Sequence, residues 1–109
     1  MAAVARGATE RGGTVLGVLP GYQRASGNRW LTIAIPTGLG HARNILVVAA
    51  ADAIIALPGK HGTRSEIAFA AILKRPVVAL DAWQTVEGVT HATTATDAVR
   101  RALALARRR

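Results

Sequence analysis

Apolar residues in this chain form short continuous runs and longer runs with helical spacing. The continuous runs at residues 53–57 and 77–80 lack the alternation of a half-exposed strand. Strands of that kind are typical of a parallel sheet that is covered on both faces. The longer runs lie between the expected strands, so the pattern predicts an α/β fold with a Rossmann-like parallel sheet flanked by helices.

Turn residues divide the chain into expected elements. Gly12 and Gly13 stop the first helix, Pro36 ends the second strand, and Pro76 stops the third helix. The expected helices cover residues 1–11, 42–51, 62–74 and 95–108. The expected strands cover residues 14–19, 30–35, 53–57 and 77–80, with a short extended piece at 86–89.

Composition narrows the class of protein. The chain has 109 residues, half of them hydrophobic, which predicts one folded domain over residues 1–109 and excludes a disordered chain. Cysteine is absent, so there is no disulfide framework and no thiolate metal site. Early charges at Arg6, Glu10 and Arg11 exclude a signal-peptide core, and no apolar run is long enough to span a bilayer. A cytoplasmic location is expected.

The net charge of +8 suggests an acidic partner, but it is concentrated at one end. Residues 100–109 contain five arginines, and the rest of the chain has nine basic and six acidic residues, a net charge of +3. An arginine-rich end of a terminal helix is one interpretation, because cations suit a helix C-terminus. A tail for nucleic acid is the other. We expect no specific nucleic-acid partner and no membrane partner, and the scarcity of aromatics argues against single-strand stacking.

The segment at residues 57–66 is a candidate phosphate site. An expected strand leads into the turn at Pro58 and Gly59, and a helix opens near Gly62 and Thr63. The first amides of a helix have no internal partner and bind anions well. Thr63 would offer its hydroxyl and amide, and Lys60 a positive charge. The segment therefore predicts a phosphate-bearing ligand beyond the carboxyl end of a strand.

Glu66 follows Thr63 by three residues, which leaves two interpretations open. In a capping box, Thr63 would cap the helix and Glu66 would reach back to the amide of Thr63, with no function required. Alternatively, the carboxylate of Glu66 acts on a bound ligand.

A second strand-to-helix segment covers residues 36–44. It contains Gly38 and Gly40 and continues to Arg43 and Asn44. Since parallel strands end on one side of a sheet, we expect Arg43 to approach Glu66 there. Arg43 would bind a phosphate or orient a carboxylate; the alternative is a solvated arginine at a helix start.

Other residues with reactive or aromatic side chains give less evidence of a functional site. His41, His61 and His91 lack the spacing of metal ligands, so no metal site is predicted. Trp30 and Trp83 are interpreted as packing anchors.

Two motifs together resemble a known family. They are Pro-Thr-Gly-x-Gly-x-x-Arg-Asn at residues 36–44 and Pro-Gly-x-x-Gly-Thr-x-x-Glu at residues 58–66. They are similar to motifs of the Lonely Guy superfamily of Rossmann-like proteins, also called lysine-decarboxylase-like. Residues 17–21 and 35–40 look typical of a small bacterial branch that also resembles molybdenum-cofactor carrier proteins.

The resemblance implies an expected function. The superfamily's enzymes hydrolyse the N-glycosidic bond of nucleoside 5′-monophosphates, which would make Arg43 and Glu66 the catalytic residues. The implied phosphate and nucleotide contacts are Pro58, Gly59, Lys60, Gly62, Thr63, Gly38, Gly40 and Asn44. The alternatives are a carrier that binds a pterin-type molybdenum cofactor without turnover, and an inactive interaction module. No further cofactor is implied, and homo-oligomers are typical of the family.

This chain departs from the family pattern in two places. Lys60 stands where the family's loop has its second glycine. The family also begins with a strand, a helix and another strand before the part that this sequence matches. We therefore expect an N-terminally truncated sheet, with marginal stability and self-association as consequences.

Overall fold

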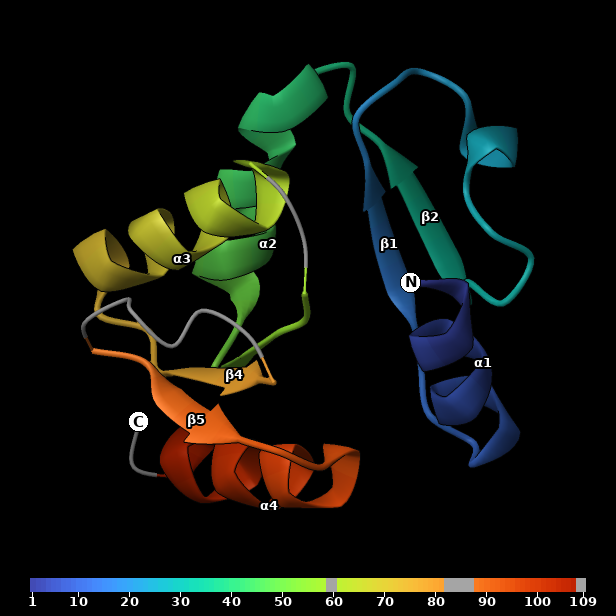
Figure 1. Cartoon of the computed structure of the whole chain (residues 1–109). Helices are drawn as coiled ribbons and strands as arrows, with labels where there is room; N and C mark the ends of the chain where they lie inside the picture. Colours follow the sequence, from blue (N-terminus) through green and yellow to red (C-terminus); the bar gives the residue numbers. More distant parts are fainter. Residues whose placement is uncertain (59–60, 82–87, 108–109) are drawn as a thin grey trace. The chain divides into compact units, whose positions relative to one another are not determined.

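The structure is a computed structural model that describes residues 1–58, 61–81 and 88–107 (Figure 1). The chain divides into two compact units, the N-terminal unit of residues 1–43 and the C-terminal unit of residues 44–109. All strand pairs in the described residues are parallel and helices flank them, so the predicted α/β fold is confirmed. That the whole chain acts as one domain stays a prediction.

The N-terminal unit is a helix followed by two strands and two short 3-10 helices. Its elements are α1 (Ala2–Glu10), β1 (Leu16–Leu19), η1 (Arg24–Ser26), β2 (Ile33–Pro36) and η2 (Gly40–Arg43). The predicted stop of the first helix is confirmed, because Gly12 has a φ of 80° and the Gly13 N–H donates to the Ala8 carbonyl at 2.8 Å. That backbone turn suits glycine at the end of a helix.

Strands β1 and β2 form a two-stranded sheet with little cover. Leu16 lies opposite Ile33, and Val18 lies opposite Ile35. Leu16 is 51% exposed, and Ile33 and Ile35 are also exposed. Within residues 1–43, all of which the structure describes, Ala5 is the one fully buried apolar residue. A two-stranded sheet with so small a core is marginal on its own.

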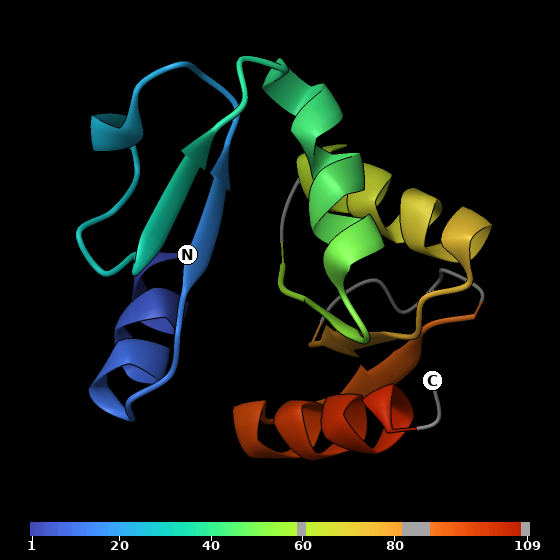
Figure 2. The same ribbon diagram turned by 180° about the vertical axis from the view of Figure 1, so that it is seen from behind.

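The C-terminal unit has a three-stranded sheet between helices, and Figure 2 shows it from behind. Its strand order is β3-β4-β5. Its elements are α2 (Asn44–Ala50), β3 (Ile54–Ala56), α3 (His61–Leu73), β4 (Val77–Leu80), β5 (Thr90–Ala92) and α4 (Ala95–Ala106).

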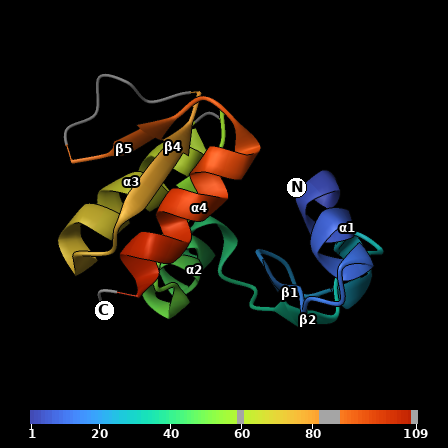
Figure 3. The same ribbon diagram turned by 90° about the horizontal axis from the view of Figure 1, so that it is seen from below.

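Successive residues of β4 face opposite sides of this sheet and enter two separate core clusters. Val77 packs with Val48 of α2 and Ile67 of α3. Val78 packs with Ala98 and Ala102 of α4. Helices α2 and α3 thus cover one face and α4 the other (Figure 3). The prediction of strands buried on both faces is confirmed for residues 77–80, whereas in the run at residues 53–57 Ile55 is 38% exposed.

Several predicted boundaries are wrong, among them the start of the second strand, which lies at Ile33 and not at residue 30. The last strand lies at Thr90–Ala92 rather than at 86–89, part of which falls outside the described residues. Helix α3 ends at Leu73, one residue early, because Lys74 turns to a φ of 57° and the Arg75 N–H donates to the Ala70 carbonyl at 2.8 Å. A left-handed residue of this kind closes a helix.

Candidate functional site

In the N-terminal unit, the strands end at two connected loops. We call residues 37–40 the glycine loop. The Thr37 hydroxyl donates to the Leu19 carbonyl at 2.7 Å, and the Gly38 N–H donates to the Gly21 carbonyl at 2.8 Å. The Gly40 N–H donates to the Pro20 carbonyl at 2.9 Å. The end of β1 therefore holds the glycine loop in place by direct hydrogen bonds.

Gly38 needs to be glycine for two reasons. Its φ is 69°, a left-handed value that other residues rarely adopt, and a Cβ at this position would overlap the ring of Tyr22. Gly40 has a φ of 60°, but a Cβ there would meet nothing within 4 Å. Tyr22 thus lies directly against the glycine loop, a placement that neither sequence motif indicates.

These hydrogen bonds limit what the glycine loop offers a ligand. The N–H groups of Gly38 and Gly40 donate to chain carbonyls, and the Leu39 N–H donates to Thr37 Oγ1 at 3.2 Å. Such amides are less available to a phosphate than free ones. The predicted contacts of Gly38 and Gly40 with a nucleotide therefore stay a prediction.

Arg43 ends η2 and is half-buried. Its Nε is buried and has no hydrogen-bond partner among residues 1–58, 61–81 and 88–107. A buried guanidinium N–H without a partner is costly, and a planar fork of donors suits phosphates and carboxylates.

In the C-terminal unit, Pro58 follows β3 and is exposed, and α3 begins at His61. Gly62 is the second residue of the helix. Gly59 and Lys60, two of the predicted phosphate contacts, lie outside the described residues. A strand that ends at Ala56 and a 13-residue helix that begins at His61 are the two elements that the sequence predicted around an anion site.

The capping-box interpretation of Thr63 and Glu66 is wrong. Thr63 is the third residue of α3 and Glu66 the sixth, so Thr63 is not the residue that caps the helix. The sequence was misleading here because Gly62, a poor helix former, lies inside the first turn. Both side chains are half-buried.

Asn44 begins α2 and is 2% exposed. Its Nδ2 donates to the Ser65 hydroxyl at 3.1 Å, which joins the start of α2 to the second turn of α3. Asn44 therefore has a structural partner next to Glu66 in sequence. Its predicted role in contacting a nucleotide stays a prediction, as does the approach of Arg43 to Glu66, because those two residues belong to different units.

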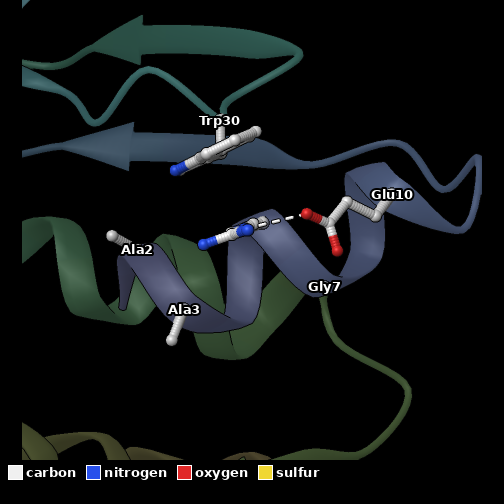
Figure 4. A pocket seen from close by; sticks show the side chains of 6 residues that line it. Ala2, Ala3, Gly7, Glu10 and Trp30 are labelled. Atoms are coloured by element: carbon white, nitrogen blue, oxygen red, sulfur yellow. Dashed lines mark hydrogen bonds and ion pairs between the residues drawn. The ribbon is translucent and has the colours of Figure 1, made fainter.

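The described N-terminal unit also has an open pocket of about 400 Å³ along α1 (Figure 4). The Arg6 Nε and Glu10 Oε1 atoms of its lining pair along α1 at 2.8 Å, and the guanidinium of Arg6 lies 5.4 Å from the Trp30 ring centroid. Arg29 lies 4.5 Å from the same centroid. The pocket lining is Ala2, Ala3, Arg6, Gly7, Glu10 and Trp30, none of them a predicted site residue.

Part of the arginine-rich end is engaged within α4. The Asp97 carboxylate accepts hydrogen bonds from Arg100 and from the Arg101 Nε, the latter at 2.8 Å. The hydrogen bond from Arg100, followed by that from Arg101, lowers the pKa of Asp97 below its usual value. These arginines are therefore partly neutralised by their own helix, in line with the interpretation as a solvated helix end.

The fold and the loops at the strand ends define a Rossmann-like α/β protein with candidate ligand loops. The chain belongs to the SLOG cluster4 family, whose model matches residues 1–106. No helix in the described part of the chain is long and apolar enough to cross a membrane.

Solved structures of cofactor-binding proteins are similar to this chain. A molybdenum cofactor binding protein from Rippkaea orientalis is 29% identical, with a TM-score of 0.83 over 93% of this chain and 68% of that one. The molybdenum cofactor carrier protein from Chlamydomonas reinhardtii is 34% identical, with a TM-score of 0.77 over 92% of this chain and 68% of that one. The predicted likeness to the carriers is confirmed at the level of fold.

A curated but uncharacterized protein from Archaeoglobus fulgidus is 44% identical in an alignment 85 residues long that covers 72% of this chain and 56% of the relative. The chain thus spans about half the length of that relative.

Proposed function

We propose that this chain binds a molybdenum cofactor, a pterin that carries a phosphate group, and holds it without chemical conversion. The observation that supports the proposal best is the 34% identity to a carrier of that cofactor, which extends over nearly the whole chain. The function of the carrier is a property of that protein, and its transfer to this chain is our inference.

The start of α3 is the proposed phosphate contact. Its first amides point out of the helix without an internal partner, and the dipole of a 13-residue helix adds partial positive charge there. Thr63 lies in this first turn and is partly accessible, so its hydroxyl is a candidate donor. Pro58, Gly59, Lys60 and Gly62 complete the proposed loop.

Arg43, in the N-terminal unit, is a separate candidate for the phosphate contact. Its buried Nε has no partner among the described residues, so a ligand oxygen would satisfy a donor that those residues leave unpaired. Charge-assisted hydrogen bonds from arginine to phosphate are about twice as strong as neutral ones.

Hydrolysis of nucleoside 5′-monophosphates is the second candidate function. It is favoured by the motif residues Arg43 and Glu66 and by the position of Glu66, half-buried in the second turn of α3 rather than in a capping box. In that function Arg43 would orient the nucleotide. Glu66 would stabilise the positive charge that develops on the sugar.

Calorimetry with neopterin monophosphate and adenosine monophosphate separates the two functions. A carrier binds the pterin more tightly and releases no free base from the nucleotide. Thr63→Val should weaken pterin binding about tenfold through loss of one donor to a charged group. The control Thr96→Val, an exposed threonine of α4, should leave it unchanged.

If the wild type releases free base from adenosine monophosphate and Glu66→Gln does not, the carrier function is refuted and hydrolysis is supported. No binding of either ligand at millimolar concentration would refute both. We further propose that the chain forms homo-oligomers in the cytoplasm. Sedimentation of the purified chain would test its self-association.

A further inference from the structure

Tyr22 is an exposed aromatic side chain in the loop that follows β1. It is 81% exposed, yet its ring lies against Gly38 at the carboxyl ends of β1 and β2. Ligands of open parallel α/β sheets bind beyond this end of the strands. An aromatic ring therefore lies where the fold places ligands.

Backbone hydrogen bonds hold the glycine loop, which the Tyr22 ring contacts, in a defined place. Gly21, the residue before Tyr22, accepts the N–H of Gly38 at 2.8 Å, and Pro20 accepts the N–H of Gly40 at 2.9 Å. Gly38 has no Cβ and a φ of 69°, which lets the ring approach the loop backbone. One side of the ring contacts the loop, and the exposure leaves most of the rest open to a ligand.

The rings of the other aromatic residues that the structure describes already contact other side chains. Trp30 has guanidinium groups of Arg6 and Arg29 over its ring, and Phe69 packs against the core of the C-terminal unit. Tyr22 is thus the described aromatic side chain with a surface available for stacking.

We propose that Tyr22 is a ligand-binding residue that stacks on the planar heteroaromatic ring of the bound pterin. The inference rests on the proposed function and extends it, since it assigns the ring end of the ligand to a residue outside both motifs. Offset stacking between flat aromatic rings is favourable, and tyrosine loses little conformational freedom when it provides such a surface.

Binding of three probes to Tyr22 variants tests the inference. The probes are unsubstituted pterin, neopterin monophosphate and inorganic phosphate. Tyr22→Ala should weaken binding of both pterins about tenfold and leave phosphate binding unchanged, because stacking of a base on an aromatic side chain is worth about 1–3 kcal/mol. Tyr22→Phe keeps the ring and should bind all three probes as the wild type does.

Ile72→Ala is the matched control, because Ile72 is 73% exposed on α3 and should not affect any probe. Tyr22 is the single tyrosine of the chain, so its ring resonances in NMR report on stacking without ambiguity. We expect upfield shifts of these resonances on pterin addition.

Wild-type affinity for both pterins in Tyr22→Ala would overturn the inference while leaving the proposed function intact. Failure of the wild type to bind neopterin monophosphate would overturn the proposed function and this inference together. Loss of phosphate binding in Tyr22→Ala would also overturn the inference, since it would indicate a damaged loop instead of lost stacking.

Discussion

The two strand-to-helix loops look alike in sequence but differ in structure. In the N-terminal unit, the amides of the glycine loop donate to the Leu19–Gly21 segment and to Thr37, and a four-residue 3-10 helix follows. In the C-terminal unit, the loop after β3 leads into the 13-residue helix α3. The same pattern of strand, glycine and helix thus produces a loop with hydrogen-bonded amides in one unit and the start of a long helix in the other.

The two units also differ in how they are stabilised. The C-terminal unit has apolar clusters on both faces of its sheet, whereas Ala5 is the fully buried apolar residue of the N-terminal unit. A larger buried apolar area gives greater stability. We therefore expect the C-terminal unit to carry most of the chain's stability and the N-terminal unit to depend on its loop hydrogen bonds.

The largest expected effect is that of a charge in the core of the C-terminal unit. Val78 is fully buried, so Val78→Asp should cost about 4 kcal/mol or more and abolish the cooperative unfolding transition in urea. Leu16→Asp, at a residue of β1 that is 51% exposed, should shift the transition by less than about 1 kcal/mol. Equal losses in the two variants would contradict the difference between the units.

A smaller effect is expected at the glycine loop. Gly40→Ala should cost about 1–2 kcal/mol because of its left-handed φ of 60° alone. Gly38→Ala should cost more, because a Cβ would also displace the ring of Tyr22. Urea denaturation with NMR of the Tyr22 ring measures both effects. A Tyr22 environment that changes equally in the two variants would show that the ring does not rest on Gly38.

The bond that joins α2 to α3 should have a measurable coupling energy. Asn44→Ala and Ser65→Ala each remove one partner of the 3.1 Å hydrogen bond. A double-mutant cycle should give a coupling of about 1 kcal/mol in the free energy of unfolding. Additive losses would mean that the Asn44–Ser65 bond contributes nothing to holding the helices together.

The smallest effect is a pH dependence at α4. Because its arginine partners lower the pKa of Asp97 in the folded chain, Asp97 stabilises the fold above the usual carboxyl pKa of 3.8. That stabilisation is lost as the pH falls through the lowered pKa. Asp97→Asn should be less stable than the wild type at neutral pH, and the difference should vanish in acid. A difference that persists unchanged in acid would show that the charge of Asp97 does not contribute.

Much of the fold could be predicted because local signals and burial agree. Residues 77–80 form a strand as predicted, since a fully apolar run between Pro76 and Asp81 has few alternatives. The position of strand β5 is not predicted correctly, because Thr90–Ala92 has a weak strand pattern. The strand is specified by its pairing with residues 78–80 of β4.

The candidate site was less predictable than the fold. Sequence motifs identified the two loops, but they gave no sign that the amides of the glycine loop are already used, which depends on carbonyls about twenty residues away. Tyr22 was missed although a signal existed, because an aromatic residue directly follows a glycine at the end of an expected strand. Its position against Gly38 is a tertiary contact that no local pattern specifies.

The central claim is that the chain binds a phosphate-bearing pterin, and amide NMR during a titration with neopterin monophosphate tests it most directly. We predict saturable shifts at Thr63 in the first turn of α3 and at Tyr22 beside the glycine loop, with the core residue Val78 unchanged. A folded chain whose Thr63 and Tyr22 signals do not move at millimolar pterin would contradict the claim.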